Sequence, residues 1–175
     1  MKTTDLKELY LDELRDLYSA ENQIVDALPK MADAAKTTEL KDAIKAHLEQ
    51  TKGQIQRLQT IFDDLGEKPT GEFCDATAGL LKEGDKVVKT MDSSSVRDAA
   101  IIGAAQRVEH YEMAAYGTTR TYAELLGFDD HASLLQATLD EETETNFSLN
   151  NLAMEQVNIA ALSESRVSAS AGGKQ

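Results

Sequence analysis

Residues 104–117 read AAQRVEHYEMAAYG and carry two glutamates on what is expected to be the buried face of a long helix. Alanine, glutamine, glutamate and methionine favour a helix, and no proline interrupts residues 95–126 around them. Glu109 and Glu112 are three residues apart, so both lie on one side of that helix. Because Tyr116 and other apolar residues share this side, the two glutamates interrupt an apolar face.

The composition of the whole chain is typical of an all-helical protein. The chain has 175 residues, 41% of them hydrophobic and only 5% aromatic, with 2 prolines. Alanine, leucine, glutamate, lysine and glutamine are abundant, and all of them favour helices. Ordinary domains run ~100–200 residues. The length therefore indicates one domain with a hydrophobic core.

The charge of the chain excludes several classes of partner. With 31 acidic and 18 basic residues, the net charge is −13, spread along the chain. Such a chain repels nucleic-acid backbones and anionic membrane surfaces, and no apolar run approaches the ~20 residues of a membrane span. The N-terminal residues lack an apolar signal core, and the single Cys74 cannot form an internal disulfide. We therefore expect a cytoplasmic protein without nucleic-acid or membrane partners.

Hydrophobic residues recur at spacings of three to five and predict four long helices with one short helix between them. The expected long helices are residues 5–35, 39–65, 95–126 and 131–162, and the short helix is 74–91. Two helix hairpins joined by one long connection are typical of ferritin-like four-helix bundles, and the absence of a repeat argues against a solenoid. The prediction is an all-α ferritin-like four-helix bundle over residues 1–162, with a long crossover that carries a short fifth helix. Residues 163–175 are Gly/Ser-rich and are expected to form a disordered polar tail.

Every predicted long helix carries polar residues within its apolar face. Besides Glu109 and Glu112, these are Glu21 in the first helix, His47, Gln50 and Gln54 in the second, and Glu142 and Asn146 in the fourth. In an antiparallel hairpin, residues equidistant from the turn lie side by side, at ~1.5 Å of rise per residue. By this rule Glu21 is level with Gln50, Glu112 with Glu142, and Glu109 with Asn146. The sequence therefore predicts one polar layer through the middle of the bundle.

A layer of four buried carboxylates requires a compensating positive charge. Burying one unpaired charge costs several kcal/mol, and Lys52 and Arg107 are predicted to face outward. Divalent ions are the sensible alternative, since inward carboxylates of helix bundles build di-iron and di-manganese sites. We therefore expect a dinuclear iron or manganese centre. His47, His110 and Gln54 are expected to support the ligands by hydrogen bonds instead of binding metal, and Glu141 is expected to face solvent.

The sequence resembles the YciF/YciE group of ferritin-like stress proteins, also described as a domain of unknown function. The resemblance covers nearly the whole chain and rests on DLYSAENQI at 16–24, VRDAAIIGAAQRVEHYEMAAYGT at 96–118 and LDEETETNFSLNNLA at 139–153. It implies a rubrerythrin-related four-helix bundle, usually a homodimer, with a candidate di-metal centre and no established reaction. The implied metal ligands are Glu21, Glu109, Glu112, Glu142 and the residues at positions 50 and 146.

Two positions depart from the pattern of that group. Where the group commonly has a second glutamate in the second helix, this chain has Gln50, and where it commonly has an aspartate in the fourth, this chain has Asn146. Each exchange keeps an oxygen ligand but removes a negative charge. With four carboxylates in place of six, we expect weaker metal binding or occupancy by a single ion.

Two functions are compatible with these observations. The first is a cytoplasmic, stress-associated metal protein whose iron or manganese centre consumes peroxide or oxidises Fe(II), with an electron donor that the sequence does not indicate. The alternative is a non-enzymatic stress protein that associates through its helix faces. In that alternative the polar layer is a degenerate metal site of protonated carboxyls, hydrogen-bonded to Gln50, Gln54 and Asn146.

Overall fold

The computed structural model describes residues 5–70 and 72–172, which are all-helical and contain no strand. The elements in chain order are α1 (Leu6–Ala34), α2 (Thr38–Leu65), α3 (Asp75–Thr90), α4 (Ser95–Leu126), α5 (Asp129–Leu152), the π-helical segment η1 (Ala153–Val157) and α6 (Asn158–Gly172). The all-helical prediction is confirmed. Helix α5 begins two residues before the predicted start at His131, because acidic residues suit a first helical turn.

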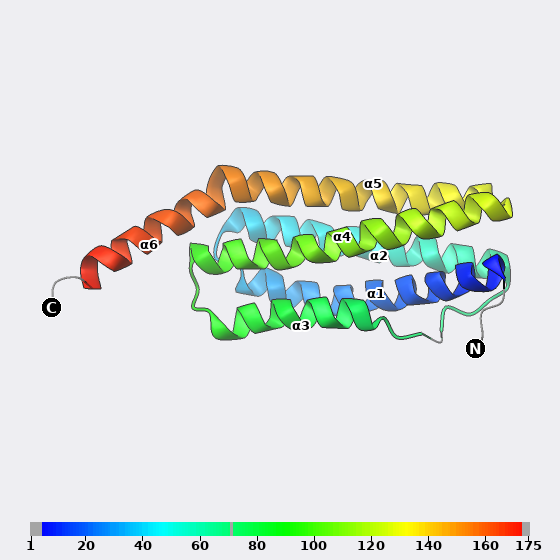
Figure 1. Ribbon diagram of the computed structural model, residues 1–175, viewed down its shortest axis with the longest axis horizontal. Coiled ribbons are helices and arrows are strands. Elements are labelled where there is room, and N and C mark those ends of the chain that lie inside the picture. Colours follow the sequence, from blue (N-terminus) through cyan, green and yellow to red (C-terminus); the bar gives the residue numbers. More distant parts are fainter. Residues whose placement is uncertain (1–4, 71, 173–175) are drawn as a thin grey trace.

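The long helices α1, α2, α4 and α5 lie side by side, and α3 covers one face of them (Figure 1). Helix α1 packs against α2, and α4 packs against α5; α1 also contacts α4, and α2 contacts α5. Helix α3 contacts α1 and α4 within the long connection between the two hairpins. The order of the helices and the short helix in the connection agree with the sequence prediction.

The ends of the hairpin helices are fixed by glycines and by one buried carboxylate. Gly66 and Gly127 follow α2 and α4 with φ of 66° and 77°, a left-handed conformation that glycine adopts without strain. In the turn between α1 and α2, the backbone N–H groups of Lys36 and Thr37 each donate to the Asp98 carboxylate at 2.8 Å. Asp98 is fully buried in the first turn of α4. It therefore ties the first hairpin to the start of the second.

Two apolar clusters fill the interior, one toward each end of the long helices. The first includes Ile24, Leu28, Leu40, Ile44, Ile101, Ile102, Val108 and Leu149. The second includes Tyr10, Leu14, Leu17, Leu58, Ile61, Phe62, Tyr116 and Leu135. Each long helix carries buried polar residues between the two clusters, among them Glu21, His47, Gln54, Glu112 and Glu142. A polar layer therefore separates two apolar cores.

The chain after α5 stays helical, which corrects the prediction of an irregular tail. The π-helical segment is followed by α6, which runs to Gly172 and leaves the long helices at an angle (Figure 1). The hydroxyls of Ser163 and Ser165 donate to helix carbonyls four residues earlier, and Glu164 accepts from Ser95 N at 2.8 Å. The serines, read as disorder signals, are therefore accommodated in a helix that docks on α4. Residues 173–175 of the predicted tail lie outside the described residues.

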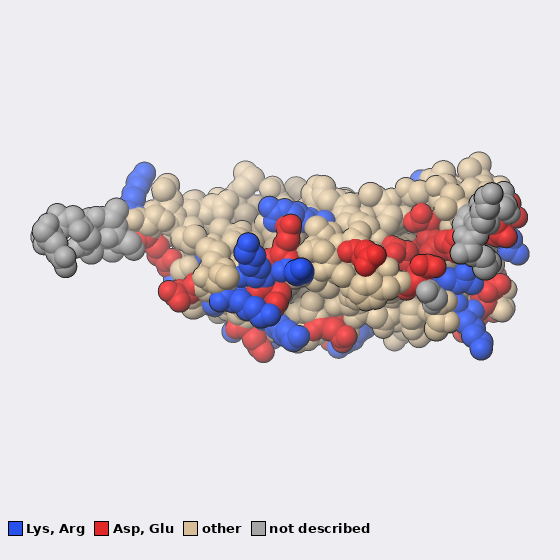
Figure 2. Space-filling view, turned by 60° about the horizontal axis from the view of Figure 1, so that its bottom comes forward, with Lys and Arg blue, Asp and Glu red and all other residues tan. Residues whose placement is uncertain are grey.

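Acidic and basic side chains are interspersed on the face of the molecule in Figure 2, without a large cluster of either sign. Within the described part of the chain, every helix is too polar or too short to cross a lipid bilayer.

Removing the Asp98 carboxylate is expected to destabilise the fold. In Asp98→Ala, two backbone N–H groups at the start of α2 lose a charged acceptor, at a cost of about 2 kcal/mol. Urea unfolding followed by circular dichroism measures the change in the free energy of unfolding. The matched control is Asp92→Ala, at an exposed position six residues before Asp98. Equal stability of the two variants would contradict the role given to Asp98.

Candidate metal centre

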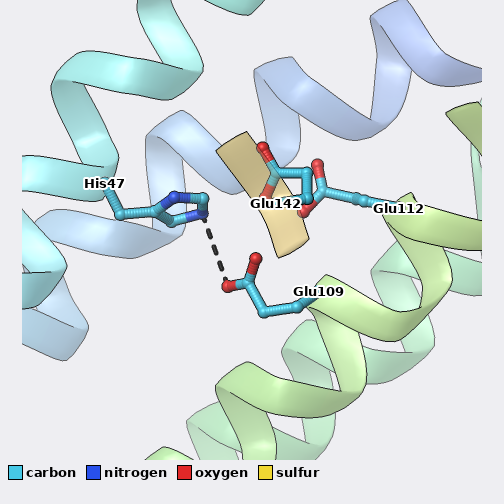
Figure 3. Close-up of side chains that lie close together, drawn as sticks. All are labelled: His47, Glu109, Glu112 and Glu142. Atoms are coloured by element: carbon cyan, nitrogen blue, oxygen red, sulfur yellow. Dashed lines mark ion pairs between the residues drawn. The ribbon is translucent and has the colours of Figure 1, made fainter. Parts of the chain in front are cut away.

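Four buried side chains from three helices meet in the polar layer. They are His47 of α2, Glu109 and Glu112 of α4, and Glu142 of α5 (Figure 3). One ligand atom from each lies within 4.8 Å of the ligand atoms of the other three. All four side chains are buried, so solvent does not screen them from one another. We call these four residues the core cluster.

Glu21 of α1 adds a further carboxyl to the same layer. It is fully buried, and its Oε1 accepts a hydrogen bond from the hydroxyl of Tyr116 on α4. Its electrostatic interactions with Glu142, Glu109 and Glu112 place it next to the core cluster. The layer therefore receives at least one ionisable group from each of the four long helices.

Burial disfavours charge on every group in this layer whose pKa is shifted. Burial, followed by the neighbouring carboxylates, raises the pKa of Glu21, Glu109 and Glu112 well above the usual range. Burial also lowers the pKa of His47, against the attraction of Glu142. His47 Nε2 lies 3.6 Å from Glu109 Oε1, yet both shifts favour the neutral forms. Without a metal, the contact between His47 and Glu109 is therefore one between two neutral groups and not an ion pair.

Several ligand atoms in the layer have no hydrogen-bond partner. These atoms are the Oε2 atoms of Glu21, Glu109, Glu112 and Glu142 and the Nδ1 atom of His47. Unpaired buried polar atoms cost free energy and are rare in folded proteins. A divalent cation would use these lone pairs and offset the repulsion between the carboxylates. Oxygen ligands with one imidazole suit manganese and iron, so the residues fit the expected metal.

One cation next to the layer was missed by the sequence prediction. Arg57 donates to Glu141 through both terminal nitrogens and to Thr138 Oγ1 at 3.1 Å. Glu141 is half-buried in this pair, so its predicted solvent-facing position was wrong. Partial burial alone would raise the pKa of Glu141, but hydrogen bonds from Arg57 and Gln54 outweigh it and lower the pKa. Arg57 thus neutralises Glu141, and the core carboxyls keep no comparable partner among the described residues. The signal in the sequence was its position three residues after Gln54, on the same side of α2.

Most of the sequence-predicted site residues come together in the layer. Glu21, Glu109, Glu112 and Glu142 meet there, and Gln54 donates a hydrogen bond to Glu142 from a fully buried position. The predicted contacts of the hairpin partners are only partly matched, because Gln54 and not Gln50 of α2 reaches the centre.

Gln50 and Asn146 lie at the rim of the layer. Both are half-buried; Gln50 accepts from Thr145 on α5 at 3.4 Å, and Asn146 accepts from Gln106 on α4 at 3.2 Å. Three residues advance a helix by about 300°, so Gln50 lies about 60° around α2 from His47, at the edge of the inward stripe. The two residues therefore lie at contacts between helices. Distance from the hairpin turn, which placed them in the layer from the sequence, gives the level of a residue but not whether it lies at the edge or the centre of the bundle.

The two histidines differ from each other in the structure. His47 lies in the core cluster with a ring nitrogen beside Glu109, closer to the potential ligands than the supporting role predicted for it. His110 is exposed, and its Nδ1 bonds to the backbone oxygen of Gln106 at 2.7 Å. The prediction that His110 supports the site was therefore wrong. His110 follows Glu109 directly, and a rotation of ~100° per residue turns it away from the layer.

The fold and the site define an all-helical protein with a buried cluster of glutamates and one histidine that could hold a metal. The chain belongs to the family described as a domain of unknown function, DUF892, which matches residues 5–162. Protein YciF of Escherichia coli (strain K12) is 44% identical over 159 residues, which cover 90% of this chain and 95% of that protein. The resemblance stated from the sequence is thus confirmed.

Solved structures share this fold. The crystal structure of the Escherichia coli stress protein YciF matches with a TM-score of 0.85 and 43% identity, covering 90% of this chain and 99% of that one. YcfI from Rhodopseudomonas palustris matches with a TM-score of 0.81 and 45% identity, covering 85% of this chain and 95% of that one. A protein from Xanthomonas campestris, 21% identical with a TM-score of 0.76 over 93% of this chain and 99% of that one, shares the fold alone.

The metal-free chain is expected to lose stability as the pH rises from about 5 to 8. The folded state raises the pKa of Glu21, Glu109 and Glu112, whereas unfolded glutamates titrate near ~4.3. The folded chain therefore holds more protons in this interval. The stabilisation is complete below pH ~4.3 and is lost as the pH rises through the folded pKa values, by at most about 1.4 kcal/mol per pH unit for each carboxyl. The lowered pKa of His47 opposes this trend, but it is one group against three.

Urea unfolding of the chelator-treated chain at several pH values measures this slope. Glu112→Gln, which removes one of the titrating carboxyls without changing its shape, is expected to flatten it. Glu144→Gln, at an exposed position on α5, is the matched control and is expected to leave it unchanged. A free energy of unfolding that increases over the same interval would show that the buried carboxyls are not protonated in the folded chain.

Proposed function

We propose that this chain is a cytoplasmic, stress-associated metal protein whose four long helices form a ferritin-like four-helix bundle around an iron or manganese centre. The observation that carries the proposal is the core cluster: His47, Glu109, Glu112 and Glu142 are all buried, and one ligand atom of each lies within 4.8 Å of those of the others. One carboxyl oxygen of each glutamate has no hydrogen-bond partner. The stress association rests on the similarity to the Escherichia coli stress protein YciF. Its acidic charge of −13 supports a role without nucleic-acid or membrane partners, and the family resemblance supports a homodimer.

The proposed centre binds one ion tightly and a second ion more weakly. The core cluster supplies one imidazole and three carboxyls for the first ion. Glu21 is the additional carboxyl for the second, and it accepts a hydrogen bond from Tyr116. Gln50 and Asn146, which carry no charge, lie at the rim. This distribution favours unequal affinities over two equivalent sites.

The chemistry proposed for the centre is consumption of peroxide or oxidation of Fe(II). Iron or manganese would supply the redox capacity and the open coordination positions. The chain itself contributes a buried site, carboxyls whose protons must leave when metal binds, and Tyr116, which donates a hydrogen bond to Glu21. Gln54 orients Glu142 from α2. These groups allow metal uptake to be coupled to proton release.

A second candidate function is supported by the hydrogen bonds within the layer. Tyr116 donates to Glu21, and Gln54 donates to Glu142, so part of the layer is satisfied without metal. Together with the raised pKa of Glu21, Glu109 and Glu112, this arrangement suits a non-enzymatic stress protein with a protonated, degenerate site. Metal retention separates the two candidates.

Metal content by elemental analysis tests the proposal. After anaerobic loading with Mn(II) or Fe(II), the chain is expected to retain about one ion after desalting and to approach two in excess metal. His47→Ala and Glu112→Gln are expected to weaken binding at least tenfold, because even groups that only support a metal ligand typically contribute ~10–100-fold. The matched control is His110→Ala, since His110 is exposed on α4. Retention of no metal by the unaltered chain would favour the second candidate, and peroxide consumption by the loaded chain tests the reaction.

Adding negative charge at the rim is expected to strengthen metal binding. Gln50→Glu places a carboxylate near His47, and Asn146→Asp places one beside Gln106. Together they are expected to raise the affinity for Mn(II) about threefold to tenfold, or ~1 kcal/mol, through screened attraction. Gln56→Glu on the exposed side of α2 adds the same charge away from the layer and is the control. An affinity unchanged by the rim substitutions would sink this explanation of the two departures.

A further inference from the structure

A cavity of about 310 Å³ lies directly beside the core cluster. Side chains from α1, α2, α4 and α5 line it, and Leu81 of α3 closes one side. Most of the lining is aliphatic, from residues such as Ile24, Leu28, Val108 and Leu149. The cavity therefore belongs to the apolar cluster at one end of the long helices, where a core would normally be filled.

The two ends of the cavity differ in character. At the inner end lie His47 and Glu109, both more than nine-tenths buried, with His47 Nδ1 and Glu109 Oε2 free of hydrogen-bond partners. At the outer end the lining includes three exposed residues, Ala46 of α2 and Glu144 and Ser148 of α5. The cavity thus connects the surface between α2 and α5 with two polar side chains of the core cluster.

We propose that this cavity is the binding site for a small aliphatic molecule with one uncharged polar group, a hydroxyl or a carbonyl, held at His47 and Glu109. The position of that group beside a metal rests on the proposed function. The apolar part of the site does not, because its walls need no metal. The ligand is thus an organic substrate or regulator of the centre, in addition to peroxide or Fe(II).

The size and lining of the cavity fit the aliphatic part of such a ligand. An apolar cavity of ~150 Å³ stays dry and takes up benzene, and this cavity is larger. Ligand sites of small molecules are typically apolar cavities with a few polar groups that fix orientation. Here the buried polar groups His47 and Glu109 lie at the inner end, Glu144 and Ser148 lie at the outer end, and Val108 and Leu149 offer only van der Waals contact. The chain of the ligand therefore extends from the inner end toward the surface between α2 and α5.

The charges around the cavity favour an uncharged polar group. Without a metal, a carboxylate would meet the acidic Glu109 and Glu144, and no lysine or arginine is among the described residues that line the cavity. An ammonium group would face repulsion from any divalent ion in the core cluster. A hydroxyl or carbonyl avoids both costs and can still form hydrogen bonds with His47 or Glu109.

Saturation-transfer NMR with 1-hexanol tests the site on the full chain, both chelator-treated and loaded with Mn(II). We expect saturable binding of 1-hexanol in both states, with hexanoate at least tenfold weaker in the chelator-treated chain and hexylammonium at least tenfold weaker in the Mn(II)-loaded chain. Ala105→Phe, which fills the cavity from α4, is expected to weaken hexanol binding at least tenfold. Ala114→Phe, the same substitution at an exposed position of α4, is the matched control. Ser148→Trp at the exposed rim repeats the test without changing the core and is expected to weaken binding at least threefold.

The outcomes separate this proposal from the metal proposal. In the Mn(II)-loaded chain, the protons next to the hydroxyl of hexanol are expected to broaden more than the terminal methyl. Hexanol binding to a chain that retains no metal would overturn the proposed function and leave the apolar site standing. Retention of metal, with hexanol binding absent or insensitive to both Ala105→Phe and Ser148→Trp, would overturn the ligand site alone. Equal broadening along the ligand would refute the assigned orientation.

Discussion

The burial of several carboxyl groups in one layer between two apolar cores is the constraint that shapes this molecule. A single glutamate between two helices could stay charged by turning to solvent. Here Glu21, Glu109, Glu112 and Glu142 come from three helices, are all buried and meet at one level. In such a layer charge is costly, so the groups must be protonated, hydrogen-bonded or bound to a cation. The apolar clusters on both sides supply the packing that keeps the four helices together despite this cost.

The layer has a closed side and an open side. Toward α1 and α4, the hydrogen bond between Glu21 and Tyr116 completes the contact between the two helices. Toward α2 and α5, Gln54 and Arg57 bind the carboxyls of α5, and the cavity beside His47 reaches the surface. In the proposed function, ions, protons and small molecules would therefore exchange on the side of α2 and α5. Arg57 lies at the border of that side and holds Glu141 away from the core carboxyls.

Gln50 and Asn146, the two departures from the pattern of the related proteins, lie outside the core cluster. Gln50 and Asn146 lie at seams between helices, each hydrogen-bonded to a neighbour, whereas the four buried glutamates and His47 stay in the layer. The lost charges therefore belong to the rim. In the proposed centre, this arrangement would lower the affinity for a second ion more than that for the first, and the core cluster would remain to bind one ion.

The sequence by itself determined the four long helices, the short helix between them, their order and the glutamates of the layer, because helical periodicity and breaks in an apolar face are local patterns. It also indicated membership in the family, since long motifs such as residues 96–118 are specific. Only the tertiary structure decided which neighbours of those glutamates face inward. A rotation of ~100° per residue turns His47 into the layer and His110 out of it, and whether Gln50 or Gln54 reaches the centre depends on how α2 is rotated against α5. The pairing of Arg57 with Glu141, the docking of α6 on α4 and the cavity beside the core cluster arise from contacts between helices distant in sequence, and no local pattern encodes them.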